Sequence, residues 1–223
     1  MSLIHLYWKT VKEVLTRPRS FFRNLPSQGG MSTPLAFALV THWIGSVLGY
    51  LWSLQFRSIS SSWLEQILSE VSDDIDYSGK SAFMDQTKHI LSEWFSGLGA
   101  VILDPFLVLV NILVSAFFVY IAARIFVTPG RHDRPEVIRY EAAVKIISYG
   151  LTPSVLIGVP LIGSMLSAIY TFFLTIIGVS AYYRVSTLRG MLIYLFPKVI
   201  IFGIIALGSL AFLTLLAVIG FLI

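Results

Sequence analysis

Apolar runs long enough to cross a membrane alternate with short polar segments along most of the chain. A helix needs roughly 20 residues to cross a hydrocarbon core of about 30 Å, so each such run predicts a transmembrane helix. Pro34 suits the first turn of the first helix, and Asp104 followed by Pro105 is expected to break a longer apolar stretch. Three spans are therefore predicted at residues 34–56, 105–127 and 193–223.

A further apolar stretch, from Ile146 to Tyr183, contains no charged residue. As one helix it would be about 57 Å long, so we expect it to fold back on itself. Glycine and proline favour the reversal at Gly158, Pro160 and Gly163. The pattern thus adds spans at residues 142–157 and 161–183, and it predicts an all-α protein with five transmembrane helices in one bundle.

Basic residues are distributed unevenly between the polar segments. The segment before the first run has one acid, Glu13, against Lys9, Lys12, Arg17, Arg19 and Arg23. The loop at residues 57–104 is acidic, the later connections are basic, and no charge follows Lys198. Short basic segments stay in the cytoplasm during insertion, so the N-terminus is predicted inside and the C-terminus outside.

Two amphipathic regions flank the predicted spans. Apolar residues recur at helical spacing in residues 3–15, so we expect residues 1–33 to form a basic arm lying along the inner membrane surface. A cytosolic helix packed on the loops is the alternative. In the outer loop, residues 63–71 and 83–94 predict two short helices. The membrane domain is expected to span residues 34–223.

Composition supports this class, since 56% of the 223 residues are hydrophobic and 13% are charged, against about a quarter charged in soluble proteins. The net charge of +4 lies mainly in the predicted cytoplasmic segments, where anionic lipid headgroups are the expected partner and nucleic acid is not. The chain has no cysteine, which excludes disulfides and thiolate metal sites.

Asp104 is the acid inside the apolar runs that we single out as a candidate transport or ion site, because intramembrane carboxylates often carry protons or bind cations. Its position before a proline at the start of a predicted helix also fits a helix cap. Both interpretations stay open at the level of sequence.

His42 could bind a proton or metal, or it could form a hydrogen bond to a neighbouring helix. Lys145, Lys198 and Arg124 are expected to snorkel to the cytoplasmic headgroups.

No catalytic motif, phosphate-binding loop or metal-ligand spacing is evident, so we predict no enzymatic activity, cofactor or metal. Gly45 and Gly49 form a GxxxG pair, where two helix backbones can approach closely. Such a pair allows a homo-oligomer. The residues expected to pack helices together are Gly45, Gly49, Pro160, Gly163 and Gly178.

The most specific pattern begins with Ser148, Tyr149 and Pro153 and continues with Pro160, Gly163, Tyr170, Gly178, Ser186 and Arg189. It resembles the Yip1 domain family, in which a Ser-Tyr pair precedes a proline, a Pro-x-x-Gly hairpin follows, and a Ser and an Arg precede the last helix. The segment from Arg17 to Phe22 is similar to the entry segment of prokaryotic members. Ser148, Tyr149 and Pro153 join Asp104 as candidate site residues. The hydroxyl groups of Ser148, Tyr149 and Thr152 could equally satisfy carbonyls freed by the prolines.

The resemblance implies a five-span membrane protein with a cytoplasmic N-terminus. Eukaryotic members act in vesicle trafficking and bind Rab-type GTPases through long N-terminal regions, and the short arm here favours a prokaryotic inner-membrane member. We expect a non-enzymatic protein that organises membrane lipids or an unidentified protein partner. A channel or transporter built on broken helices is the alternative.

Overall fold

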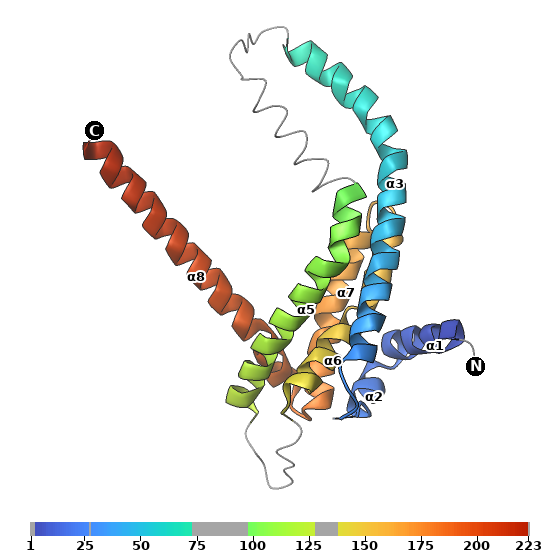
Figure 1. The fold of residues 1–223 in the computed structure, drawn as a ribbon. Coiled ribbons are helices and arrows are strands. Elements are labelled where there is room, and N and C mark those ends of the chain that lie inside the picture. The colour runs from blue at the N-terminus through green and yellow to red at the C-terminus, as the bar shows by residue number, and fades with distance from the viewer. Residues whose placement is uncertain (1–2, 27, 73–97, 128–137, 223) are drawn as a thin grey trace.

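The computed structural model describes residues 3–26, 28–72, 98–127 and 138–222 of the chain (Figure 1). The described part is helical, which confirms the predicted all-α class. The helices, in chain order, are α1 (Leu3–Thr16), α2 (Pro18–Arg23), α3 (Ser32–Ser72), α5 (Leu98–Phe126), α6 (Tyr140–Gly150), the 3₁₀ helix η2 (Thr152–Gly158), α7 (Gly163–Tyr182) and α8 (Thr187–Leu222).

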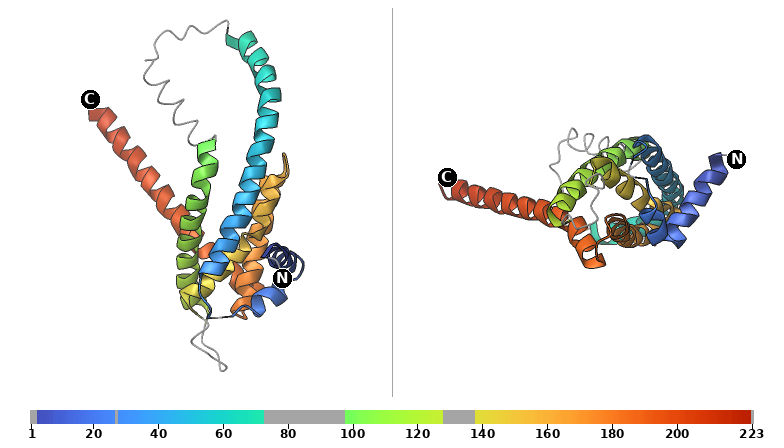
Figure 2. Two further views of the ribbon diagram at one scale, coloured as in Figure 1. Left: turned by 45° about the vertical axis from the view of Figure 1, so that its right-hand side comes forward. Right: turned by 90° about the horizontal axis from the view of Figure 1, so that it is seen from below.

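A bundle forms from α3, α5, α7 and the pair α6–η2, which lie alongside one another (Figures 1 and 2). Helix α1 runs crosswise to α3 at one side of this bundle, and α8 leaves it on the other side (Figure 2). Ile193 and Tyr194 near the start of α8 are buried, whereas Val199 and Phe202 are 66% and 74% exposed. The prediction of one bundle thus holds for the beginning of α8 but not for the rest of this helix.

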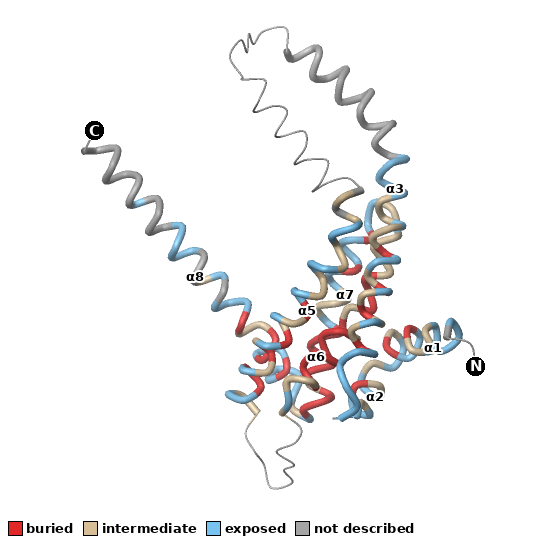
Figure 3. Tube along the Cα trace, in the orientation of Figure 1, coloured by how far each residue is buried: buried red, intermediate tan, exposed pale blue. Residues whose placement is uncertain are grey.

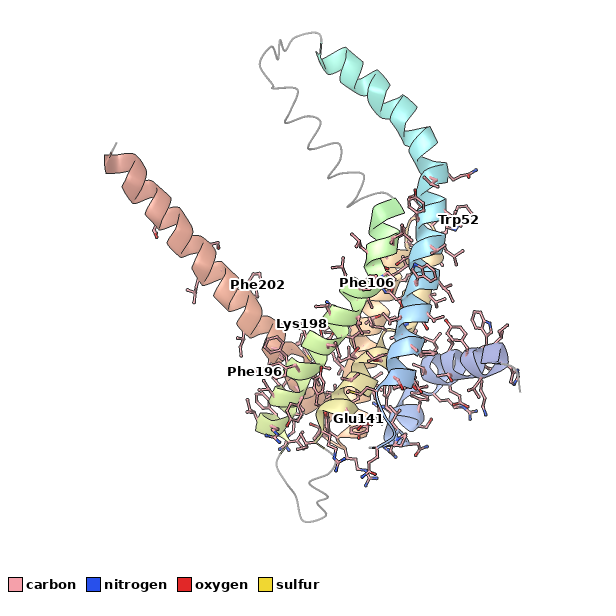
Figure 4. All side chains as sticks on the ribbon, viewed as in Figure 1. Trp52, Phe106, Glu141, Phe196, Lys198 and Phe202 are labelled. Carbon is pink, nitrogen blue, oxygen red and sulfur yellow. The ribbon has the colours of Figure 1, made fainter. Side chains whose placement is uncertain are left out.

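Within the described residues, three helical segments are long and apolar enough to cross a membrane, namely Ser32–Gln55, Val101–Phe126 and Gly163–Tyr182. Many of their large apolar side chains face outward, and Phe106 is an example (Figure 4). The buried residues gather towards the end of the bundle where α2, α6 and the start of α8 meet (Figure 3). Lipid hydrocarbon chains can cover this exposed apolar surface as well as protein side chains can.

The predicted break at Asp104 and Pro105 is wrong, because α5 runs through both residues from Leu98 to Phe126. A proline inside a helix leaves the carbonyl four residues earlier without its amide donor. Here that carbonyl belongs to Val101, and the indole Nε1–H of Trp43 on α3 donates to it over 3.2 Å. The neighbouring helix therefore replaces the missing donor, and α5 stays continuous.

Helix α3 is longer than predicted, since it continues past Arg57 to Ser72. The short outer helix expected at residues 63–71 is thus the end of α3 and not a separate element. The second, expected at residues 83–94, lies outside the described residues.

The predicted third span is not one continuous α-helix. It consists of α6 and η2, and Pro153 lies at the start of η2. Pro153 cannot donate to the Tyr149 carbonyl, and the Thr152 hydroxyl donates to that oxygen over 2.6 Å instead. This contact confirms the prediction that a hydroxyl near Pro153 satisfies a freed carbonyl. Ser148 is fully buried and its hydroxyl has no partner within the described residues.

The chain reverses between the end of η2 at Gly158 and the start of α7 at Gly163, as predicted from the glycine and proline pattern. Two backbone hydrogen bonds close this turn, from Gly163 N to the Val159 oxygen at 3.0 Å and from Ile162 N to the Pro160 oxygen at 2.8 Å. Leu161 adopts a φ of 67°, in the left-handed region, and its side chain is 88% exposed.

The GxxxG pair packs within the chain. A Cβ at Gly45 would overlap the Ser154 carbonyl oxygen of η2, and one at Gly49 would lie 3.2 Å from Ile157. The small residues thus let the backbones of α3 and η2 meet closely. This face of α3 is occupied by the chain's own 3₁₀ helix.

We expect Trp43→Phe to lower the free energy of unfolding by about 1–3 kcal/mol, because the Val101 carbonyl loses its donor in apolar surroundings. In a Pro105→Ala background the helix supplies its own amide donor, so Trp43→Phe should cost far less. Thermal unfolding of the four proteins in one detergent measures both costs. Equal costs in the two backgrounds would show that the indole does not compensate for the proline.

Candidate functional site

An open cavity of about 460 Å³ lies between α3, α5 and the turn that joins η2 to α7. It collects several residues that the sequence singled out for different reasons. Its lining includes Ser46, Gly49, Asp104, Pro160, Gly163 and Ser164.

Asp104 is held by two side chains of α3. The Ser46 hydroxyl donates to Oδ2 over 2.6 Å, and His42 Nε2 lies 3.1 Å from the same oxygen and 3.3 Å from Oδ1. The side chains of His42 and Asp104 are 18% and 25% exposed. The helix-cap interpretation is wrong, because α5 begins well before Asp104 and the carboxylate binds α3 instead.

The spacing of the α3 residues explains this geometry. His42 and Ser46 are one turn apart, so both lie on the face towards α5, and Trp43 beside them reaches Val101. The expectation that His42 forms a hydrogen bond to a neighbouring helix is confirmed. The cavity leaves the pair of His42 and Asp104 partly open.

The same site offers little for a metal ion. Among the described residues, no group of three or more His, Asp or Glu side chains is placed to hold one. A single carboxylate, one imidazole and one hydroxyl can bind a proton or a small polar group, and Ser164 and Ser53 add further hydroxyls to the cavity.

The other candidate site residues lie elsewhere. The ring of Tyr149 packs against Phe21 of α2 with centroids 5.0 Å apart and against Phe37 of α3 at 5.2 Å. Tyr149 lines a second cavity, of about 510 Å³, together with residues of the arm such as Glu13 and Arg17. Pro153 and Ser148 are buried. None of these three lines the Asp104 cavity. The four candidate site residues therefore do not form one site.

The N-terminal arm is attached to the bundle by specific contacts. The Tyr7 hydroxyl donates to Thr41 on α3 over 3.1 Å, and the Tyr170 hydroxyl on α7 donates to the Leu15 carbonyl over 2.6 Å. Phe22 of α2 is fully buried, and its ring fits where Gly178 has no side chain. The five basic residues predicted to meet lipid headgroups are all exposed, namely Lys9, Lys12, Arg17, Arg19 and Arg23.

Lys145 does not snorkel, contrary to the prediction. It is 2% exposed, and its ammonium group donates to the carbonyls of Pro26 at 2.9 Å and Gln28 at 3.1 Å. It also lies 2.9 Å from Glu141, and its hydrogen bond holds the pKa of the Glu141 carboxyl below its usual value. Lys145 thus fixes the connection between α2 and α3, a role that sequence spacing did not signal.

Lys198 and Arg124 are partnered with tyrosines. The Lys198 ammonium donates to the Tyr194 hydroxyl over 2.7 Å and lies 4.1 Å from that ring. The Arg124 guanidinium lies 4.8 Å from the ring of Tyr120. Each cation is therefore stabilised by an aromatic neighbour one turn away.

The fold and the apolar surface together define a helical integral membrane protein. Within this class, the model of the Yip1 domain matches residues 12–210, and the chain belongs to the Yip1 domain family. The family resemblance drawn from the Ser-Tyr, Pro-x-x-Gly and Ser/Arg residues is thereby confirmed. Searches of curated proteins and of solved structures found no match.

Proposed function

We propose that this Yip1-family protein is non-enzymatic and organises membrane lipids, or a protein partner, at the cytoplasmic face of a prokaryotic inner membrane. The observation that carries the proposal is the placement of α1, which is docked crosswise to the bundle and leaves apolar side chains uncovered. The family membership and the three candidate spans support the membrane part of the proposal.

Three sides of α1 differ in chemistry. Val11 and Val14 are 4% and 0% exposed and pack against the bundle. Ile4 and Trp8, one turn apart, are 71% and 55% exposed. Lys9, Lys12 and Glu13 lie further round the helix and are exposed.

A helix with this arrangement suits the membrane interface. Its uncovered apolar side can enter the acyl-chain boundary while the lysines meet anionic headgroups. Each basic residue near such a surface contributes on the order of 1 kcal/mol. The arm therefore links the position of the bundle to the composition of the inner leaflet.

A channel or transporter is the second candidate, and the Asp104 site is the observation that favours it. A carboxylate, an imidazole and a hydroxyl meet at an open cavity in otherwise apolar surroundings. The continuous course of α5 weighs against it, because a break at Pro105 is one of the two features of the sequence that favour a solute path. The other, a break after Pro153, corresponds to the change from α6 to η2.

The absence of cysteine from the chain allows the arm to be probed with single labels. A nitroxide at Ile4→Cys should be more accessible to oxygen than to a polar nickel complex in anionic liposomes, because its side is expected to enter lipid. The matched label at Lys9→Cys should show the reverse order. If both labels were more accessible to the nickel complex than to oxygen, α1 would not lie at the membrane interface.

For the topology, we propose five spans with the N-terminus inside and the C-terminus outside, from the Lys/Arg asymmetry. A cysteine at Ile223→Cys in intact cells should react with a membrane-impermeant maleimide, and one at Ser2→Cys should react only after lysis. Protection of the C-terminal cysteine in intact cells would contradict this topology.

The two candidate functions are separated by reconstituting the full chain in liposomes that contain anionic and neutral lipids. The lipid-organising function predicts enrichment of anionic lipid around the protein and proton flux no greater than in empty liposomes. The transport function predicts flux that Asp104→Asn abolishes without changing thermal unfolding. Flux that persists in Asp104→Asn would exclude the carboxylate as its carrier.

A further inference from the structure

An open cavity of about 610 Å³ lies where α2 meets the turn between α7 and α8. Its lining combines three arginines with three hydroxyl-bearing residues, Arg19, Arg23, Arg184, Ser180, Ser186 and Thr187. The cavity shares no lining residue with the Asp104 site.

The arginines come from segments that the fold holds in place. Arg19 and Arg23 are one turn apart on α2, so both can point to one side, and α2 is held against α7 by the buried Phe22. Arg184 follows the end of α7 with a φ of 53°. Their convergence is therefore a property of the fold and not of long flexible side chains alone.

Two hydrogen bonds between Ser180 and Val185 close the turn that carries Arg184. Val185 N donates to the Ser180 carbonyl over 3.1 Å, and the Ser180 hydroxyl donates to the Val185 carbonyl over 3.1 Å. Gly190 of α8 lies against Ser180, where a Cβ would be only 2.8 Å away. The two helix ends are thus packed tightly around the cavity.

Among the described residues, no acid pairs with the arginines that line this cavity. Glu141, the acid of α6, is paired with Lys145. Guanidinium groups that line one cavity repel each other, and an anion bound between them lowers that repulsion.

The start of α8 adds partial positive charge to the same cavity. The Ser186 hydroxyl accepts the amide of Arg189 over 3.4 Å, as an N-cap does. The amides before it point back along the helix axis with partial positive charge. Guanidinium groups, hydroxyl groups and the amides at a helix N-terminus are the donors that phosphate oxygens prefer.

We propose that the cavity between Arg19, Arg23 and Arg184 binds a phosphate group, either that of an anionic lipid headgroup or that of a soluble phosphate compound. Carboxylates fit the charge, but three arginines converging from two segments suit an anion with oxygens directed to several sides. The lipid source rests on the proposed function and would bring the headgroup to the end of the candidate span Gly163–Tyr182.

The site is tested with the full chain in a neutral detergent by native mass spectrometry. The probes are phosphatidic acid, phosphatidylglycerol, phosphatidylcholine and inorganic pyrophosphate. We expect Arg184→Gln and Arg23→Gln each to weaken binding of an anionic probe about tenfold, because each removes a charge-assisted hydrogen bond. Arg189→Gln is the matched control, since it removes the same charge from the start of α8 without lining the cavity.

The outcomes separate the sources. Tight binding of phosphatidic acid or phosphatidylglycerol that the cavity variants weaken assigns the site to lipid, and the same result with pyrophosphate assigns it to a soluble phosphate compound. Equal binding of every anionic probe by wild type, the cavity variants and the control would overturn the proposal. Thermal unfolding checks that the variants are folded, and Arg23→Gln on α2 provides the test if Arg184→Gln is not.

The same experiment distinguishes this site from the proposed function. Anionic lipid that still gathers around Arg184→Gln and Arg23→Gln would leave the lipid-organising role intact and remove the cavity from it. A cavity that binds pyrophosphate, in a protein that does not enrich anionic lipid, would keep the site and remove the role.

Discussion

The structure depends on one constraint, that a backbone carbonyl in hydrocarbon must find a donor because water cannot reach it. The chain places a proline in α5 and another at the start of η2, and each leaves one carbonyl without its amide. Trp43 supplies the donor for the first, from a neighbouring helix. Thr152 supplies it for the second, from the residue next to the proline. The two solutions have different results, since α5 stays continuous whereas the chain after α6 tightens into a 3₁₀ helix.

These solutions also determine how the helices pack. The turn of α3 that carries Trp43 also carries His42 and Ser46, so the repair of α5 and the binding of Asp104 occur in one contact. The short helix η2 lies against Gly45 and Gly49 on the same helix. Helix α3 is therefore the element around which the polar contacts of the bundle are arranged.

The sequence predicts the parts of the fold that depend on local pattern. The apolar runs, the chain reversal near Pro160 and the helical arm all follow from residue type and spacing. The structure has helices in the apolar runs and in the arm, and a turn between Gly158 and Gly163. It does not predict the continuity of α5, because the donor that preserves it comes from a residue far away in the chain. Lys145 illustrates the same limit, since nothing around it indicates that its partners lie in the connection before α3. The pairing of Asp104 with Ser46 likewise required the packing of two helices to be known.

The aromatic contacts of the arm have a mechanical consequence. The rings of Tyr7, Phe37, Tyr149 and Phe21 contact one another in sequence, with neighbouring centroids 5.0–5.4 Å apart, and they join α1 and α2 to α3 and α6. An arm attached in this way cannot rotate independently of the bundle. If its apolar side settles at a fixed depth in the bilayer, the angle between the bundle and the bilayer normal is fixed as well. A change in bilayer thickness or leaflet composition would then tilt the whole bundle as one body.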